Sequence, residues 1–439
     1  MPHHVFLLLL DENIGLYLIS LVLSAIPIYF IAKNYSHSWV DPLRISLIFV
    51  ALANAVLLFL FFLNEIPEYL FYYSAAAIVL FWVGFLIPAK RKISFSNRKF
   101  CEDDLIIKLL FYEVLILYIS SYLYSYAAFG IPIFAESRIG TFIDSGGFGA
   151  IARITPFFQV FILMYCYRQF DGKISLGNKY IYFITFLLIV ITSILSGSRS
   201  SLVTFFSCYF GYSYYYLGIK PRDKKLVKYF PVILVGTITV LLITNDGDIV
   251  NALSALFVRI VATGDGYYMA YPNEIVNLVD AGNSAMFLLS QILAPLRIID
   301  VTTIPPPVGV QLSNILYPEM KGLFVGPNSS PPILGFVLFG YMGLIFTFVV
   351  GLLSSILIFR SSSIIPRSFV SSVVLFFIYM VAVRFMADPS YGIGSLFDVA
   401  LNLFVLLNLI LISYIIKSVL IRLPQSFSLK ASTFVNNKI

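Results

Sequence analysis

Long apolar runs with almost no charge are the feature that most constrains this chain. Of its 439 residues, 59% are hydrophobic and 12% are charged, whereas a soluble domain is roughly a quarter charged. Lipid admits only helices or closed barrels as spanning elements. The runs here are continuous and lack the alternation of period two that a strand would show, so the sequence predicts an all-α membrane protein with many spans.

Eleven runs are predicted as transmembrane helices within a single integral membrane domain, residues 1–439. Each has close to the ~20 residues that a bilayer requires. The predicted spans are Ile14–Ala32, Ile45–Leu63, Tyr69–Ile87, Leu105–Phe129, Ile151–Tyr167, Tyr180–Leu195, Leu202–Leu217, Tyr229–Thr244, Ile333–Phe359, Phe369–Val383 and Leu396–Ile416.

Basic clusters set the predicted orientation, because cytoplasmic loops collect Lys and Arg. One cluster, Lys90–Lys99, lies between the third and fourth spans, and another, Lys220–Lys228, lies between the seventh and eighth. Both clusters fall on the same side when the spans are counted, which predicts an outside N-terminus and a cytoplasmic C-terminus. The formal charge of +7 therefore follows topology and does not indicate nucleic-acid binding.

Two elements dominate the predicted outer face: a loop over 130–149 and a long segment over 245–332. The long segment is too apolar to be a free soluble domain. It contains two stretches of helical character, Val250–Ala262 and Ser284–Ile299, that are shorter than a span. We expect these stretches to lie in the membrane interface or to re-enter the bilayer beside other helices.

Cations on the predicted outer face are nearly all arginine, and the positive-inside bias does not account for them. A guanidinium binds phosphate or carboxylate through paired N–H donors. An arginine at the end of a span also snorkels to lipid headgroups, and this alternative stays open at Arg153 and Arg384. Snorkelling alone does not explain the scarcity of lysine. The outer cations are Arg138, Arg153, Arg199, Arg259, Arg297, Lys321 and Arg384.

The sequence LSGSRSS, which contains Arg199, forms the predicted tight outward turn between the sixth and seventh spans. A glycine and four serines flank this one arginine in the sequence. The first turn of the next helix also exposes free N–H groups, and this combination suits an oxyanion.

Two outer carboxylates are candidates for a general base that activates a hydroxyl. Asp265 has glycines on both sides and is followed by Tyr267 and Tyr268, while Glu136 lies two residues before Arg138. A salt bridge to a nearby arginine is the alternative for each carboxylate.

The remaining polar signals are weaker. Asp246 and Asp248 form a D-x-D pair that could hold a divalent cation beside a sugar diphosphate, and Asp398 lies at the border of the predicted outer face. His3 and His4 precede the first span, and His37 is predicted to be cytoplasmic. Because the long outer segment contains no histidine, we predict that no imidazole base acts there.

These residues resemble a known family. The features that carry the resemblance are LSGSRSS at the outward turn, the R-I-V-A-T-G-D-G-Y-Y stretch in a long outer loop, and GPNSSPPILGFVLFGYMGLIF leading into the next span. With this layout of spans, the chain resembles the bacterial lipid-linked oligosaccharide repeat-unit polymerases, the Wzy-type O-antigen polymerase family. The resemblance covers the whole chain in layout, and its motifs are loose.

The resemblance implies a fold like that of the GT-C glycosyltransferases of the polymerase and ligase branch, in the bacterial inner membrane with its active site facing the periplasm. It implies metal-independent transfer, without a cofactor, between oligosaccharides linked to undecaprenyl diphosphate, and a Wzz-type chain-length regulator as a partner. Arg199 and Arg259 are then expected at the donor diphosphate, with Arg138, Arg153, Arg297 and Arg384 as further diphosphate-binding candidates. Asp265 or Glu136 would assist the attacking hydroxyl, and Tyr267 and Tyr268 would stack on sugar rings.

Three other classes remain as alternatives. A transporter or flippase of lipid-linked sugars is expected to show paired repeats and broken helices, and the sequence displays neither. The related O-antigen ligases resemble this layout but rely on a histidine in the long outer loop, and its absence from this segment favours a polymerase. A single-sugar GT-C transferase would need acidic residues in its first outer loop, where only Glu65 and Glu68 occur.

Overall fold

A computed structural model describes residues 1–89, 102–134, 149–172, 176–196, 199–219, 221, 239, 248, 258, 260–300, 303–321 and 325–422. Within these ranges the regular elements are all helical. Eight of the helices are long and apolar enough to cross a membrane. The chain is therefore a polytopic helical membrane protein, as the sequence predicted.

The long apolar helices are α2 (Ile14–Tyr35), α3 (Pro42–Phe62), α4 (Glu68–Ala89), α5 (Asp104–Phe129), α7 (Gly149–Asp171), α17 (Gly343–Phe359), α19 (Phe369–Ala387) and α20 (Pro389–Arg422). Of these, α17 is counted among the eight as part of the longer apolar segment Pro331–Ile364. Two further predicted spans are present as α8 (Leu176–Leu195) and as α9 (Arg199–Gly211), which continues into the π-helical turn η2 (Tyr212–Leu217). The predicted span Tyr229–Thr244 lies outside the described residues, so the count of eleven stays a prediction.

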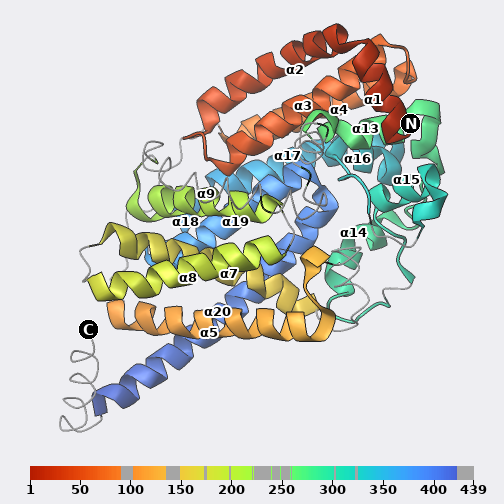
Figure 1. Cartoon of the computed structure of the whole chain (residues 1–439). Helices are drawn as coiled ribbons and strands as arrows, with labels where there is room; N and C mark the ends of the chain where they lie inside the picture. Colours follow the sequence, from red (N-terminus) through yellow and green to blue (C-terminus); the bar gives the residue numbers. More distant parts are fainter. Residues whose placement is uncertain are drawn as a thin grey trace.

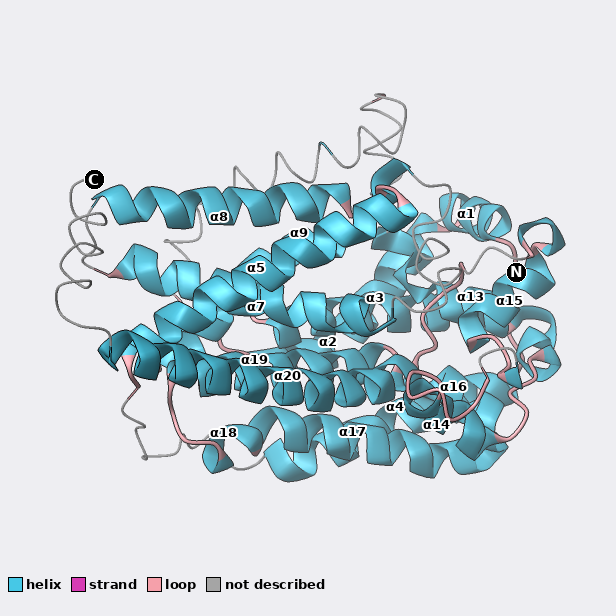
Figure 2. Cartoon of the chain, turned by 90° about the horizontal axis from the view of Figure 1, so that it is seen from below, coloured by secondary structure: helices cyan, strands magenta, loops and turns pink. Residues whose placement is uncertain are grey.

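The shorter elements gather at one end of the bundle, which we call the short-helix end (Figures 1 and 2). They are α1 (His3–Glu12), η1 (Pro132–Phe134), η3 (Ala262–Gly264), α13 (Asp265–Ala270), η4 (Pro272–Leu278), α14 (Ser284–Leu293), α15 (Val308–Leu316), η6 (Pro318–Met320), α16 (Pro331–Phe339) and η7 (Gly340–Met342). The four-residue helix α18 (Ser361–Ile364) follows α17.

Charged groups that were predicted to be cytoplasmic meet at the opposite end of the bundle. Arg168, at the end of α7, pairs with Asp104 at the start of α5 over 2.6 Å, and Lys417 of α20 pairs with Asp103. The basic clusters Lys90–Lys99 and Lys220–Lys228 lie almost entirely outside the described residues. Which face of the membrane each end occupies stays a prediction.

Close backbone contact joins α4 to α17. A Cβ atom on Gly84 would lie 2.3 Å from the carbonyl oxygen of Phe348, and one on Gly351 would lie 2.1 Å from that of Phe81. Only glycine allows this approach, because any larger residue would push the backbones apart. The two helices therefore form a tight pair on one side of the bundle.

The predicted span Ile333–Phe359 is interrupted. Its first part is α16, which folds back on α17 at Gly340, a glycine with φ of 55°. Gly335 and Gly343, eight positions apart, are in backbone contact, and the hydroxyl of Thr347 donates to the carbonyl of Pro331 over 3.4 Å. A hairpin of helices thus replaces the first part of the continuous span, and it sets the segment before Pro331 beside the bundle.

The long segment 245–332 supplies short helices, as expected. The predicted stretch Ser284–Ile299 begins correctly: Asn283 caps α14 by accepting the backbone N–H of Met286 at 3.1 Å. The helix ends at Leu293, before the predicted boundary, and a turn follows in which Arg297 has φ of 57°. Most of Val250–Ala262 and the loop residues 135–148 lie outside the described residues.

Candidate functional site

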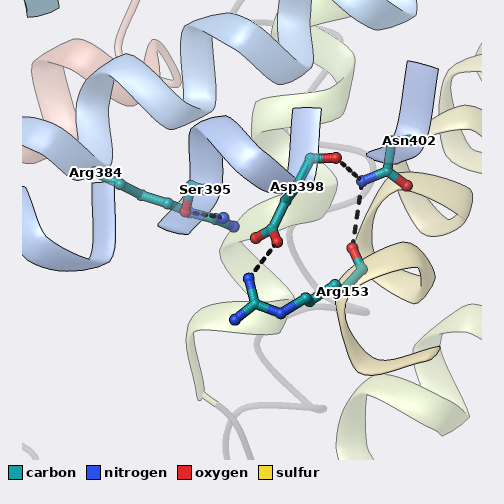
Figure 3. Close-up of polar contacts among 5 residues, drawn as sticks. All are labelled: Arg153, Arg384, Ser395, Asp398 and Asn402. Carbon is teal, nitrogen blue, oxygen red and sulfur yellow. Dashed lines mark hydrogen bonds and ion pairs between the residues drawn. The ribbon is translucent and has the colours of Figure 1, made fainter. Parts of the chain in front are cut away.

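A partly buried arginine–carboxylate pair between α7 and α20 forms the centre of the candidate site (Figure 3). Arg153, in the first turns of α7, places Nη1 2.6 Å from Oδ1 of Asp398 in α20. The side chains are 25% and 12% exposed. Asn402, one turn further along α20, donates through Nδ2 to the carbonyl of Asp398 at 2.6 Å and to that of Arg153 at 3.3 Å. Asn402 therefore ties the start of α7 to α20.

A second guanidinium approaches the same carboxylate from α19. Arg384, in the last turn of that helix, donates to the hydroxyl of Ser395 at 3.3 Å and lies over the ring of Tyr391 at 5.4 Å. Ser395 and Asp398 are three residues apart and therefore share one face of α20. Figure 3 shows the two guanidinium groups on either side of Asp398, whose carboxylate also interacts with the charge of Arg384.

This arrangement has an excess of positive charge. Two guanidinium groups face one carboxylate, so the group carries a net charge of +1 when all three are ionised. In a partly buried setting that charge favours an anion with several oxygen acceptors, since planar guanidinium groups bind phosphate through parallel N–H donors. We call Arg153, Arg384 and Asp398 the arginine pair and its counter-ion.

The structure unites two of the six arginines predicted to bind diphosphate, Arg153 and Arg384. Arg297 is exposed in the turn after α14, where it lines a shallow hollow with Asp300. Arg199 begins α9, but its side chain lies outside the description, as do Arg138, Arg259 and the candidate base Glu136. Convergence of those side chains on the pair stays a prediction.

Asp265 and the two tyrosines after it occupy α13. The carboxylate of Asp265, at the start of the helix, accepts the backbone N–H of Gly266 at 3.1 Å. Tyr267 and Tyr268 are 3% and 2% exposed. One face of Tyr268 is covered by the ring of Phe6, stacked at 4.3 Å, so that face is closed to a sugar ring. Burial raises the pKa of Tyr267 to about 12, which keeps its hydroxyl protonated at neutral pH.

A histidine from outside the long segment lies against it, a contact that the sequence did not predict. Helix α1 packs against α13, and Nδ1 of His3 lies 2.8 Å from the hydroxyl of Tyr268. Residues 245–332 contain no histidine of their own, and His3 comes from the distant N-terminus. Burial of Phe6 against Tyr268 brings the N-terminal helix to the same place, and an imidazole with it.

Sequence reasoning also missed the partners of the arginines. Asp398 was only a marginal candidate, and Asn402 was not considered. The available signal was an Asp and an Asn spaced i, i+4 in an otherwise apolar helix, since an ionisable residue within a span marks a functional site by default. Among the described residues, no group of three or more His, Cys, Asp or Glu side chains is arranged to hold a metal ion, and Asp246 of the D-x-D pair lies outside them.

Comparisons with protein-family models, with curated proteins and with solved structures find no match for this chain. The geometry of the site and the pattern of the sequence are therefore the basis for any functional proposal.

Proposed function

We propose that this chain is a glycosyltransferase that polymerises oligosaccharide repeat units linked to undecaprenyl diphosphate into an O-antigen-like polysaccharide. The observation that carries the proposal is the arginine pair and its counter-ion. Two guanidinium groups from different helices face one point in the bundle, and a lipid diphosphate is an anion that such a pair would hold.

In the proposed reaction, a hydroxyl of one lipid-linked repeat unit attacks the anomeric carbon of the donor glycan. The new glycosidic bond forms as the bond between that carbon and the diphosphate oxygen breaks. Negative charge builds up on the departing undecaprenyl diphosphate, and Arg153 and Arg384 would stabilise it in the transition state. The hydroxyl proton passes to a carboxylate, for which Asp265 and Glu136 remain the candidates.

Asp398 has a defined part in this proposal. Without substrate it pairs with Arg153 and neutralises one of the two guanidinium charges, while the hydroxyl of Ser395 accepts from Arg384. A diphosphate would replace the carboxylate as the partner of the arginines. Pre-set guanidinium groups need little rearrangement when the leaving group develops charge, and this is the source of most electrostatic catalysis.

Reconstitution of the purified chain with a defined lipid-linked repeat unit tests the proposal. We expect a ladder of longer glycans together with release of undecaprenyl diphosphate. Arg153→Lys and Arg384→Lys keep the charge but lose the planar fork, and each should lower the rate of extension about 100-fold. Arg360→Lys, at an exposed position beyond α17, is the matched control and should extend normally.

Normal ladders from both Arg153→Ala and Arg384→Ala, with all variants folded and equally abundant, would exclude the arginine pair as the site of reaction. Movement of the repeat unit across the membrane without any extension would favour the flippase alternative.

O-antigen ligase is a second candidate, because His3 lies against Tyr268. The sequence disfavoured a ligase on the ground that its outer segment lacks a histidine, and the structure supplies one from α1. The two activities differ in their acceptor. Transfer of the glycan to a lipid A core, lost on His3→Ala and with no ladder of longer lipid-linked products, would favour the ligase.

A further inference from the structure

A hollow opens between α3 and α4, beside the short-helix end. Tyr267 of α13 and the residues that begin α16 form its cover, and Met386 of α19 closes one side. Its empty volume is about 410 Å³, part of which is open to the exterior. Most of the lining side chains are apolar, so the hollow would accept a hydrocarbon more readily than a sugar.

The lining changes character along the helix axes. Asn54 of α3, the hydroxyl-bearing Tyr267 and Ser330 lie at the wall nearest the short-helix end. Val50 is one turn further from that end along α3, about 5.4 Å, and Trp82 belongs to the deeper half of α4. Ala53, Pro331 and Pro332 lie beside these polar groups, so apolar groups line the whole hollow and polar groups occur only toward one end. A lipid with its headgroup toward that end would match this lining.

Irregular backbone lines the same hollow. Residues 325–330 form no helix, yet the hairpin sets Pro331 beside Thr347, which lies within α17. Non-helical backbone at this depth in a membrane protein is tolerated only where it is buried in protein or lines a cavity. Asp388 anchors the segment by accepting the backbone N–H of Ser329 at 3.2 Å. The wall is therefore a fixed part of the fold.

The hollow and the arginine pair flank the same helix end. Met386 lines the hollow, and Arg384, two residues earlier, points to the other side of α19 toward Ser395. Because α19 ends at Ala387, only its last turn separates the two places. A lipid whose chain fills the hollow could therefore reach the arginine pair with its headgroup by passing over that turn.

We infer that the hollow between α3 and α4 seats the first isoprene units of a polyprenyl chain whose diphosphate is held by Arg153 and Arg384. This inference rests on the proposed function for the diphosphate, and it adds a site for the hydrocarbon. Selectivity for a polyprenyl diphosphate depends on the hollow and the arginine pair together. An acyl chain of a phospholipid would fill the hollow equally well but would bring no diphosphate to the arginines.

Photo-crosslinking within α4 tests the inference. A benzophenone amino acid replaces Ile78, which lines the hollow, or Val79, its neighbour, whose side chain is 60% exposed on the outside of the bundle. The full chain is placed in nanodiscs of phosphatidylethanolamine and phosphatidylglycerol that contain undecaprenyl diphosphate as the probe. Mass spectrometry then identifies the lipid attached at each position.

We expect polyprenyl adducts at position 78 and phospholipid adducts at position 79. A second arm fills the hollow: Ile78→Trp should reduce retained undecaprenyl diphosphate several-fold, whereas Val79→Trp should leave it unchanged. Phospholipid adducts alone at position 78, or equal retention by the two tryptophan variants, would overturn the inference.

The two proposals can fail separately. A chain that extends glycans but captures only phospholipid at position 78 keeps its proposed function and loses this lipid site. A chain that captures the polyprenyl lipid at position 78 but never extends glycans keeps the site and loses the polymerase.

Discussion

At the residue scale, Asp398 is the direct ion-pair partner of Arg153. Its carboxylate is 12% exposed and lies 2.6 Å from Arg153. Removing one partner of a poorly solvated ion pair leaves the other charge without compensation, which costs about 3 kcal/mol in buried pairs. Arg153 and Asp398 should therefore be strongly coupled in stability.

A double-mutant cycle measures this coupling. Arg153→Gln and Asp398→Asn should each lower the Tm in detergent by several degrees, and the double variant should lose less than the sum, with a coupling of about 1–3 kcal/mol. Arg360→Gln, at an exposed position, is the control and should combine additively with Asp398→Asn. Full additivity within the first cycle would show that the pair does not contribute to stability.

Asp41, the N-cap of α3, should give the protein a pH-dependent stability. It accepts the backbone N–H groups of His37 at 2.8 Å and Leu43 at 3.0 Å and the hydroxyl of Tyr379, yet complete burial outweighs these bonds and raises the pKa of Asp41 to about 6. Between its ordinary pKa near 3.8 and this value, the folded state binds more protons than the unfolded state. Stability therefore falls as the pH rises through this window, by a total of about 3 kcal/mol.

Asp41→Asn keeps a side-chain acceptor for the cap and removes the titration. The Tm of the wild type should fall between about pH 4 and pH 6 relative to that of the variant. Differential scanning fluorimetry across this range measures the difference. Parallel curves for the two proteins would show that Asp41 titrates normally.

Site residues could be predicted where the neighbouring sequence marks them, and not where their role depends on a contact with a distant part of the chain. Arg153 and Arg384 stood out because each is a cation at the end of an apolar run. Their meeting at Asp398 could not be read from the sequence, because Arg153 and Asp398 are 245 positions apart and nothing local specifies which faces of α7 and α20 meet. The contact of His3 with Tyr268 was missed for the same reason.

At the scale of elements, the pairing of α4 with α17 depends on glycine. Gly351→Ala would place a Cβ 2.1 Å from the carbonyl of Phe81, which forces the helices apart and should cost about 1–3 kcal/mol. Gly15→Ala is the matched control, because a Cβ there meets nothing within 4 Å and alanine favours the helix. Thermal unfolding of the two variants compares them, and equal Tm values would contradict the tight pairing.

Predicted element boundaries were accurate at some helix starts, but α7 and α20 continue past Arg168 and Lys417, the charges before which their predicted spans end. The starts of α2 and α14 were predicted to the residue. The hairpin of α16 and α17 was not, because the residues around Gly340 are as apolar as the helices on either side.

At the scale of the whole molecule, the orientation can be tested directly. Eleven spans place the two termini on opposite faces of the membrane, whereas ten or twelve would place them on the same face. A reporter that fluoresces only in the cytoplasm should be active at the C-terminus and silent at the N-terminus, and a periplasmic phosphatase should show the reverse. If the same reporter is active at both termini, the count of eleven spans is wrong.

The counter-ion at Asp398 has a consequence for selectivity. An anion that binds Arg153 and Arg384 must displace the carboxylate of Asp398 from Arg153. A carrier lipid with a single phosphate gains less from this exchange than a diphosphate, because all its acceptor oxygens surround one phosphorus atom. The two phosphates of a diphosphate can bind both guanidinium groups at once. Competition from Asp398 should therefore favour lipid diphosphates over lipid monophosphates, whatever sugar they carry.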